Sequence, residues 1–189
     1  MSPVLVVSAV SKGAEALSTL IRQVEGQADI TLCGSATEAR RLVLDYEYDL
    51  VVINTPLGTE NAEDLCRMIV EETLFPVVLI VNNELFMDIQ EQLENCGVLV
   101  VAKPIIREVF FQTLGIAKSL RRRLLGMQDE KNKLQKKIEE IKMVDQAKWS
   151  LVRNLGMDEN QAHRYIEKQA MDQRKSRFEI AYAILRTYK

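Results

Sequence analysis

Residues 49–58 read Asp-Leu-Val-Val-Ile-Asn-Thr-Pro-Leu-Gly. An apolar, largely β-branched run ends at Asn54, and the Thr-Pro-Leu-Gly that follows is typical of a turn. An apolar run without alternation indicates a strand that is covered on both faces of a sheet. The segment therefore predicts a buried strand whose carboxyl end presents the amide side chain of Asn54.

Four other segments share this composition, and residues of helical period follow each strand. Strands are expected at 3–9, 30–34, 49–54, 76–82 and 98–103, and helices at 13–24, 36–46, 61–72, 85–95 and 105–117. The expected inward faces include Ala16 and Val24 of the first helix and Tyr46 of the second. Five strand–helix repeats predict an α/β fold with a flavodoxin-like, doubly wound, parallel five-stranded sheet. Ligands of such folds bind outside the carboxyl ends of the strands, where Asn54 is expected.

The sequence from about residue 107 to 153 contains no proline and has heptad spacing. Apolar residues recur at intervals of three and four, at 117, 120, 124, 127, 134, 138 and 141. This narrow stripe with charged flanks predicts a long coiled-coil helix that forms a parallel homodimer. The residues assigned to dimerisation are Leu120, Leu124, Met127, Lys131, Leu134, Ile138 and Ile141. Lys131 interrupts the stripe, and a polar residue at such a position can specify register and strand number.

A small three-helix bundle is expected at the carboxyl end. Gly156 is placed to end the long helix, and Asp158 is placed to cap the next one. Further helices are expected at 159–172 and 177–188. Trp149, Leu155 and Tyr165 are assigned to the bundle core, although a base-stacking role is the alternative for Trp149. The expected domains are an α/β domain at 1–120, a coiled-coil helix at 121–145 and a three-helix module at 146–189.

The formal net charge of −2 conceals an asymmetry between the two parts of the chain. Residues 1–117 contain 7 Lys and Arg against 17 Asp and Glu, a net charge of −10, whereas residues 118–189 contain 18 against 10, a net charge of +8. A basic C-terminal part indicates contact with a polyanion, although a solvated basic face is the alternative.

Seven residues are candidates for that contact. They are Lys148, Arg153, Arg164, Gln173, Arg174, Lys175 and Arg177. Four of them lie at the junction of the last two helices, where unpaired N–H groups of a final helix capped by Ser176 would add to an anion-binding surface. The run Arg121–Arg123 is expected to be a solvated flank or a salt-bridge partner within the dimer.

Other classes of protein fit the sequence poorly. The longest apolar runs, such as 77–81, are far shorter than the roughly 20 residues that span a bilayer, and the N-terminus lacks the features of a signal peptide, so a cytoplasmic protein is expected. Cys33, Cys66, Cys96 and the single His163 are too few and too widely spaced for a zinc site. No nucleophile–base pair, paired acid or phosphate loop stands out, so we expect no enzyme activity and no cofactor.

The order of strands and helices, with Lys103-Pro104 after the fifth strand, makes residues 1–120 resemble the receiver domain of bacterial response regulators. The resemblance implies two acidic residues after the first strand, a phosphate-accepting aspartate that ends the third strand and a Ser or Thr that ends the fourth. This sequence instead has Ser8-Ala9, Asn54 and Val81-Asn82 at those positions.

These departures remove the chemistry that the resemblance implies. An amide cannot form an acyl phosphate, and Mg²⁺ prefers carboxylate oxygens. We therefore expect a receiver-like domain that cannot be phosphorylated on aspartate and that responds to a protein partner. Asn54 could instead serve only as a turn-former. Lys103 could instead be a charge paired with Asn54 or with a strand-end carbonyl.

Small and apolar residues of the C-terminal part follow a pattern of their own. They are Ala147-Lys148-Trp149, Leu155-Gly156-Met157, Ala162, Ala170–Arg174, Ala181 and Ile184-Leu185. With them, residues 140–189 resemble the ANTAR domain, the RNA-binding output module of antitermination regulators. The resemblance implies a dimer that binds paired RNA hairpins near terminators, so that transcription continues. A protein-interaction scaffold and a DNA-binding regulator remain open as alternatives.

Overall fold

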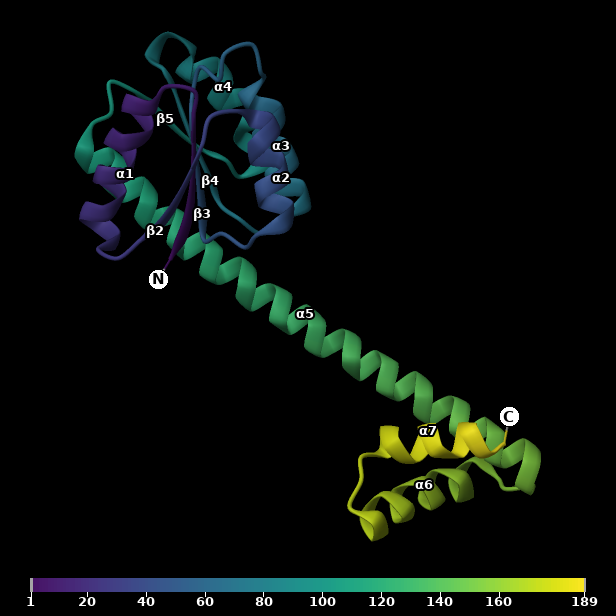
Figure 1. Cartoon of the computed structure of the whole chain (residues 1–189). Helices are drawn as coiled ribbons and strands as arrows, with labels where there is room; N and C mark the ends of the chain where they lie inside the picture. Colours follow the sequence, from purple (N-terminus) through teal and green to yellow (C-terminus); the bar gives the residue numbers. More distant parts are fainter. Residues whose placement is uncertain (1, 189) are drawn as a thin grey trace. The chain divides into compact units, whose positions relative to one another are not determined.

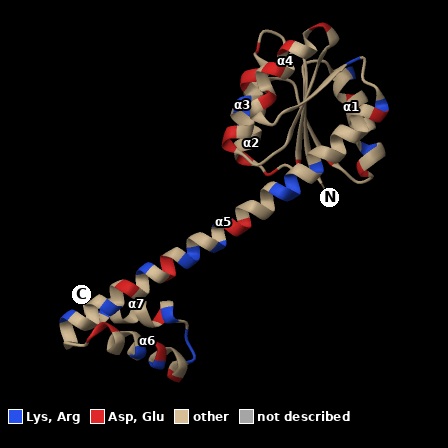
Figure 2. Cartoon of the chain, turned by 180° about the vertical axis from the view of Figure 1, so that it is seen from behind, with Lys and Arg blue, Asp and Glu red and all other residues tan. Residues whose placement is uncertain are grey.

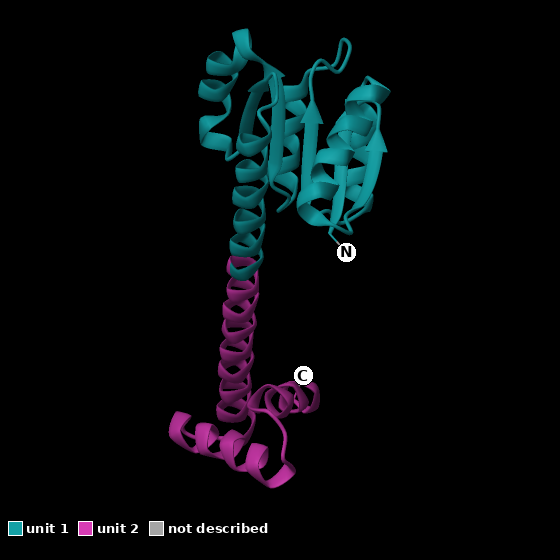
Figure 3. Ribbon diagram, turned by 90° about the vertical axis from the view of Figure 1, so that its left-hand side faces the viewer, with its two compact units in different colours: residues 1–126 teal, residues 127–189 magenta. Residues whose placement is uncertain are grey.

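The computed structural model describes residues 2–188. These residues form two compact units, and the division between the units lies after Gly126 (Figure 3). The long helix α5 (Arg107–Leu155) contributes residues to both units. Within residues 2–188, every helix is too short or too polar to cross a lipid bilayer.

The first unit is built on a single parallel sheet. Its strands are β1 (Pro3–Ser8), β2 (Asp29–Cys33), β3 (Leu50–Asn54), β4 (Val77–Asn82) and β5 (Leu99–Lys103). They are ordered β2-β1-β3-β4-β5, which confirms the doubly wound fold that was predicted. The strand order reverses beside β1, and the neighbouring strand β3 places Asn54 directly opposite Ser8.

Helices cover both faces of this sheet (Figure 1). One face packs against α1 (Ser11–Glu25) and the first part of α5, and the other packs against α2 (Ala36–Asp45), α3 (Ala62–Glu72) and α4 (Phe86–Leu93). Short 3₁₀ turns, η1 (Asn83–Leu85) and η2 (Glu94–Cys96), flank α4. Alternate residues of each strand enter the two cores, which explains the unbroken apolar runs.

Three residues of the first unit that were assigned to inward helix faces, Ala16, Val24 and Tyr46, are exposed. Tyr46 follows the last residue of α2 in an extended conformation, so the helical period no longer directs its side chain inward. Val24 lies in the last turn of α1, and its side chain is also in solvent.

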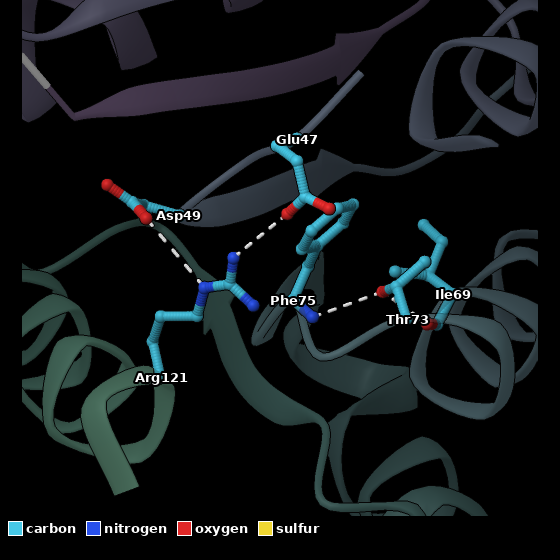
Figure 4. Close-up of polar contacts among 6 residues, drawn as sticks. All are labelled: Glu47, Asp49, Ile69, Thr73, Phe75 and Arg121. Atoms are coloured by element: carbon cyan, nitrogen blue, oxygen red, sulfur yellow. Dashed lines mark hydrogen bonds and ion pairs between the residues drawn. The ribbon is translucent and has the colours of Figure 1, made fainter. Parts of the chain in front are cut away.

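Arg121 links α5 to the segments that enter the central strands β3 and β4 (Figure 4). Its Nη2 lies 3.2 Å from Glu47, its Nε lies 3.7 Å from Asp49, and its guanidinium lies 5.1 Å from the centre of the Phe75 ring. The side chain is only 9% exposed, so the expectation of a solvated flank or a dimer salt bridge was wrong for Arg121. Lys118 adds an ion pair with Glu25 one turn earlier.

The second unit combines the remainder of α5 with α6 (Glu159–Gln173) and α7 (Arg177–Thr187). Its core contains Ala147, Leu151, Ala162, Ile166, Ala170, Ile180, Ala181 and Ile184. Gly156 follows α5 with φ +64°, and Asp158 caps α6 in a capping box with Gln161, as predicted.

Trp149, Leu155 and Tyr165 were assigned to the core of this bundle, and those assignments were wrong, because all three side chains are exposed. The Trp149 side chain is 71% exposed. Ala147 and Leu151 are the buried residues of this turn of α5, and each lies two positions from Trp149. Two positions on an α-helix correspond to about 200°, so Trp149 projects away from the bundle.

Candidate nucleic-acid interface

The strand ends of the first unit carry a neutral hydrogen-bond chain. The Asn54 Nδ2 donates to the Ser8 Oγ at 3.0 Å, and the Ser8 hydroxyl donates to the Val10 carbonyl at 3.1 Å. The first turn of α1 closes over this pair, because a Cβ on Gly13 would lie 2.8 Å from the Asn54 Nδ2 and 3.1 Å from the Ser8 Oγ. A side chain larger than hydrogen at residue 13 would therefore disturb both groups.

Lys103 belongs to the same end of the sheet. Its ammonium donates to the Thr55 carbonyl, and burial lowers the pKa of Lys103. Thr55 is held in turn by β4, because its backbone N–H and its hydroxyl both donate to the Ile80 carbonyl, at 3.0 and 2.9 Å.

The donor set at these strand ends does not fit the Mg²⁺ ion that receiver domains use. Ser8 and Asn54 offer a hydroxyl and an amide, whereas this hard cation takes carboxylate oxygens. Within residues 2–188, no group of three or more acidic, histidine or cysteine side chains is placed to hold a metal.

Glu60 holds the loop after β3 against α2, a role that sequence reasoning missed. Its carboxylate accepts from the Ala36 and Thr37 backbone N–H groups at 2.6 and 2.9 Å and from the Thr37 hydroxyl at 2.7 Å. The hydroxyl bond is the main cause of a lowered pKa for Glu60. A local pattern could not reveal this contact, because Glu60 is separated from Ala36 by 24 positions.

The turn between α6 and α7 brings four of the seven candidate RNA-binding residues together. Gln173 ends α6, Arg174 and Lys175 follow it, and Arg177 begins α7. All four are exposed, and Figure 2 shows the connection between α6 and α7 in the blue of Lys and Arg. Arg177 lies 3.6 Å from Glu167, whereas the described residues contain no ion pair of Arg174 or Lys175.

The other three candidates lie elsewhere in the second unit. Lys148 and Arg153 are on the last turns of α5, near the start of α6, and the length of α6 separates that start from the turn by about 22 Å. Lys148 pairs with Asp145 at 2.8 Å and Glu159 at 3.3 Å, which raises its pKa and leaves its side chain 17% exposed. Arg164 is exposed midway along α6.

The N-terminus of α7 is occupied by the helix's own carboxylate. Ser176 caps the helix, as expected, and Glu179 accepts from the Ser176 backbone N–H at 2.8 Å and from its hydroxyl at 2.9 Å. The backbone bond is the main cause of a lowered pKa for Glu179. An ionised carboxylate at this point repels phosphate, so the cations of the turn are better placed to attract RNA than the helix end is.

The stripe that was assigned to dimerisation follows one side of α5. Its residues in the second unit are largely exposed, with relative exposures of 56% for Met127, 61% for Leu134, 52% for Ile138 and 63% for Ile141. Lys131 is exposed among them, and Leu120 and Leu124 are half-buried in the first unit. A row of large apolar side chains at heptad spacing is costly to leave in water.

Comparison with known proteins identifies the second unit. Residues 132–185 match the ANTAR domain family. The chain carries an ANTAR domain. It is 25% identical over 172 residues to the transcriptional regulatory protein PdtaR of Mycobacterium tuberculosis, an alignment that covers 90% of this chain and 83% of that protein. The match to the ANTAR family thus covers the C-terminal part of the chain, and the similarity to a transcriptional regulatory protein extends over most of its length.

Solved structures resemble the first unit. A response regulator receiver domain protein from Clostridium thermocellum is 18% identical, with a TM-score of 0.58 over 66% of this chain and 99% of that one. An adenylate cyclase from Rhodopirellula baltica is 14% identical, with a TM-score of 0.59 over 70% of this chain and 98% of that one. At these identities the likeness establishes a receiver-like fold ahead of the ANTAR domain.

Proposed function

We propose that this ANTAR response regulator binds RNA hairpins as a dimer and thereby opposes transcription termination. The observation that carries the proposal is the α6–α7 turn of the ANTAR domain, where Arg174 and Lys175 are exposed cations outside any ion pair of the described residues. Hairpin loops offer unstacked bases and closely spaced phosphates, which such a turn can contact.

The exposed stripe of α5 supports the dimer. Burying Met127, Leu134, Ile138 and Ile141 against the same residues of a second copy would remove them from water. In this proposal residues 121–145 form the coiled coil and residues 146–189 form the RNA-binding module, so that one dimer presents two turns to paired hairpins.

The receiver-like domain, residues 1–120, has a different part in the proposal. Ser8 and Asn54 supply no carboxylate nucleophile and no ligand suited to Mg²⁺, so aspartyl phosphorylation is not the input. In its place, the activating signal is the binding of a regulatory protein partner to this domain.

The proposal is tested with purified full-length protein and a pool of RNA stem-loops that share a stem and carry randomised loops. We expect retention of a subset of loops, with affinity that falls steeply as salt rises because bound counterions are released. Duplex DNA of the same stem sequence is the competitor, and it should displace little RNA. Equal competition by the duplex would favour the DNA-binding alternative, and failure to retain any stem-loop at low salt would contradict the proposal.

Paired hairpins test the dimer separately. A transcript with two hairpins should bind more tightly than either hairpin alone, because the second hairpin binds at a high effective concentration. Equal affinity for one and two hairpins would leave RNA binding intact and contradict action as a dimer.

A further inference from the structure

Helix α6 ends at a residue whose backbone is left-handed. Arg174 has φ +53° and ψ +40°, and the Lys175 N–H bonds back to the Ala170 carbonyl at 3.0 Å. The Arg174 N–H also bonds to the Met171 carbonyl, at 3.3 Å. These bonds match the helix-terminating motif that normally places glycine at the left-handed position.

Arginine is a costly residue at this position. In the left-handed region the Cβ of a residue other than glycine lies too close to the following carbonyl oxygen, so this conformation is disfavoured relative to the right-handed one. Elsewhere in residues 2–188, each positive φ belongs to a glycine, including Gly97 after η2 and Gly156 after α5. The chain therefore uses glycine where only the backbone matters, and Arg174 departs from that usage.

Among residues 2–188, the Arg174 side chain makes no ion pair and no hydrogen bond that would hold the fold. The side chain is exposed, and the hydrogen bonds of the turn are made by the backbone. Its neighbours differ, because Arg177 pairs with Glu167 and Glu179 closes the cap of α7. A residue that strains the backbone without a structural contact is a candidate for function.

We propose that Arg174 is the specificity-determining residue of the RNA site and that it contacts a base of the hairpin loop, with Lys175 adding a phosphate contact. This inference rests on the proposed function and names the group that performs the recognition. A guanidinium offers a planar fork of donors and a face that stacks on a base, whereas an ammonium is a point charge. The hydrogen-bonded turn fixes the Arg174 backbone, so that less freedom is lost when the fork engages a base.

Two substitutions at this residue separate the role of the side chain from that of the fold. Arg174→Gly restores the residue that the backbone prefers, so the thermal midpoint should hold or rise, whereas affinity for a selected stem-loop should fall by about tenfold or more. Arg174→Lys keeps the charge, so the slope of log affinity against log salt should hold while the preference among loops is lost.

Two other positions provide matched controls in the full-length protein. Lys175→Gln should weaken binding about equally for all loops and reduce the salt slope by about 0.7–0.9, as expected for one lost phosphate contact. Arg186→Gln removes an exposed cation near the far end of α7 and should change affinity by less than about twofold.

The outcomes distinguish this inference from the proposed function. If the wild-type protein retains no stem-loop, both fail. If the wild type binds a subset of loops and Arg174→Gly or Arg174→Lys binds the same subset equally well, only the role of Arg174 is overturned. A lower thermal midpoint for Arg174→Gly would show that the side chain supports the fold, which also overturns the inference.

Discussion

At the scale of single residues, the strand ends of the first unit depend on close packing of neutral groups. Asn54, Ser8 and the Cβ-free Gly13 occupy a space where one more carbon atom would lie within 2.8 Å of the amide nitrogen. Glycine is therefore required at residue 13 because a larger residue would collide with the side chains of Asn54 and Ser8.

Gly13→Ala should destabilise the protein although alanine is the better helix former. The new methyl group would displace Asn54 and Ser8, and we expect the free energy of unfolding to fall by about 1 kcal/mol after the gain in helix propensity. Gly115→Ala in α5 is the control, because its Cβ would meet open space, and it should raise stability by about 0.5–1 kcal/mol. Denaturant unfolding of both variants measures the contrast, and equal stabilisation would contradict it.

Glu60→Gln should destabilise the protein in a pH-dependent way. The pKa of Glu60 is lowered in the folded state, so its contribution is fully present above the ordinary value of 4.5 and is lost as the pH falls through the lowered value. The variant should therefore melt below the wild type at pH 7, and the gap should close below pH 4.5. The exposed Glu91→Gln serves as the control, and a gap that is constant with pH would contradict the role of Glu60.

Local sequence patterns indicate single functional residues, but they do not indicate which distant residues those side chains contact. Sequence reasoning identified Asn54 and the cap at Asp158 from local patterns. It could not find the ion pairs of Arg121 with Glu47 and Asp49, because folding brings together positions more than 70 residues apart. A pattern along the chain contains no signal for such a contact.

At the scale of whole elements, period and composition predicted each strand and helix of the structure with small differences at their ends. Errors arose at the ends of helices, as for Tyr46 after α2, and where a helix had more than one apolar side. Trp149 was assigned inward because it is large and apolar, yet Ala147 and Leu151 determine which side of α5 meets α6 and α7. Small buried residues contribute little to an apolar pattern, so the sequence did not distinguish the two sides.

Substitutions in the stripe of α5 test the proposed coiled coil. Ile138→Lys should convert the dimer to a monomer at micromolar concentration, because it places a charge at an apolar contact between the two helices. Lys131→Ile should strengthen the dimer, since a parallel pair brings two Lys131 side chains together. Lys136→Ala, on the opposite side of the helix, is the control. Sedimentation equilibrium measures the oligomeric state of all three variants. A monomeric wild-type protein would contradict the proposed coiled coil along the stripe of α5.

At the scale of the whole molecule, charge and chemistry are divided between the two parts of the chain. Acidic residues gather on the helices of the first unit, whereas the basic turn belongs to the ANTAR domain (Figure 2). Under the proposed function, this division of charge would attract RNA to the C-terminal part and leave the receiver-like part for a partner of another kind.

Incubation with Mg²⁺ and acetyl phosphate should leave the full-length protein unchanged. We expect no phosphoryl adduct by intact-mass measurement and no change in RNA affinity, because residue 54 is an amide and Ser8-Ala9 offer no carboxylate to hold the metal. Asn54→Asp restores the nucleophile alone and should also remain unmodified. An acid-stable, base-labile adduct on the wild type would contradict this expectation.

The hydrogen-bonded pair of Asn54 and Ser8 also bears on how a response would end. In a regulator that is activated by an aspartyl phosphate, which is a mixed anhydride, spontaneous hydrolysis limits how long the active state lasts. The Asn54 amide cannot form such a phosphate, so hydrolysis cannot limit the response here. For the regulator proposed here, the duration of a response would instead be set by how long the partner remains bound and by how many copies of each protein the cell contains.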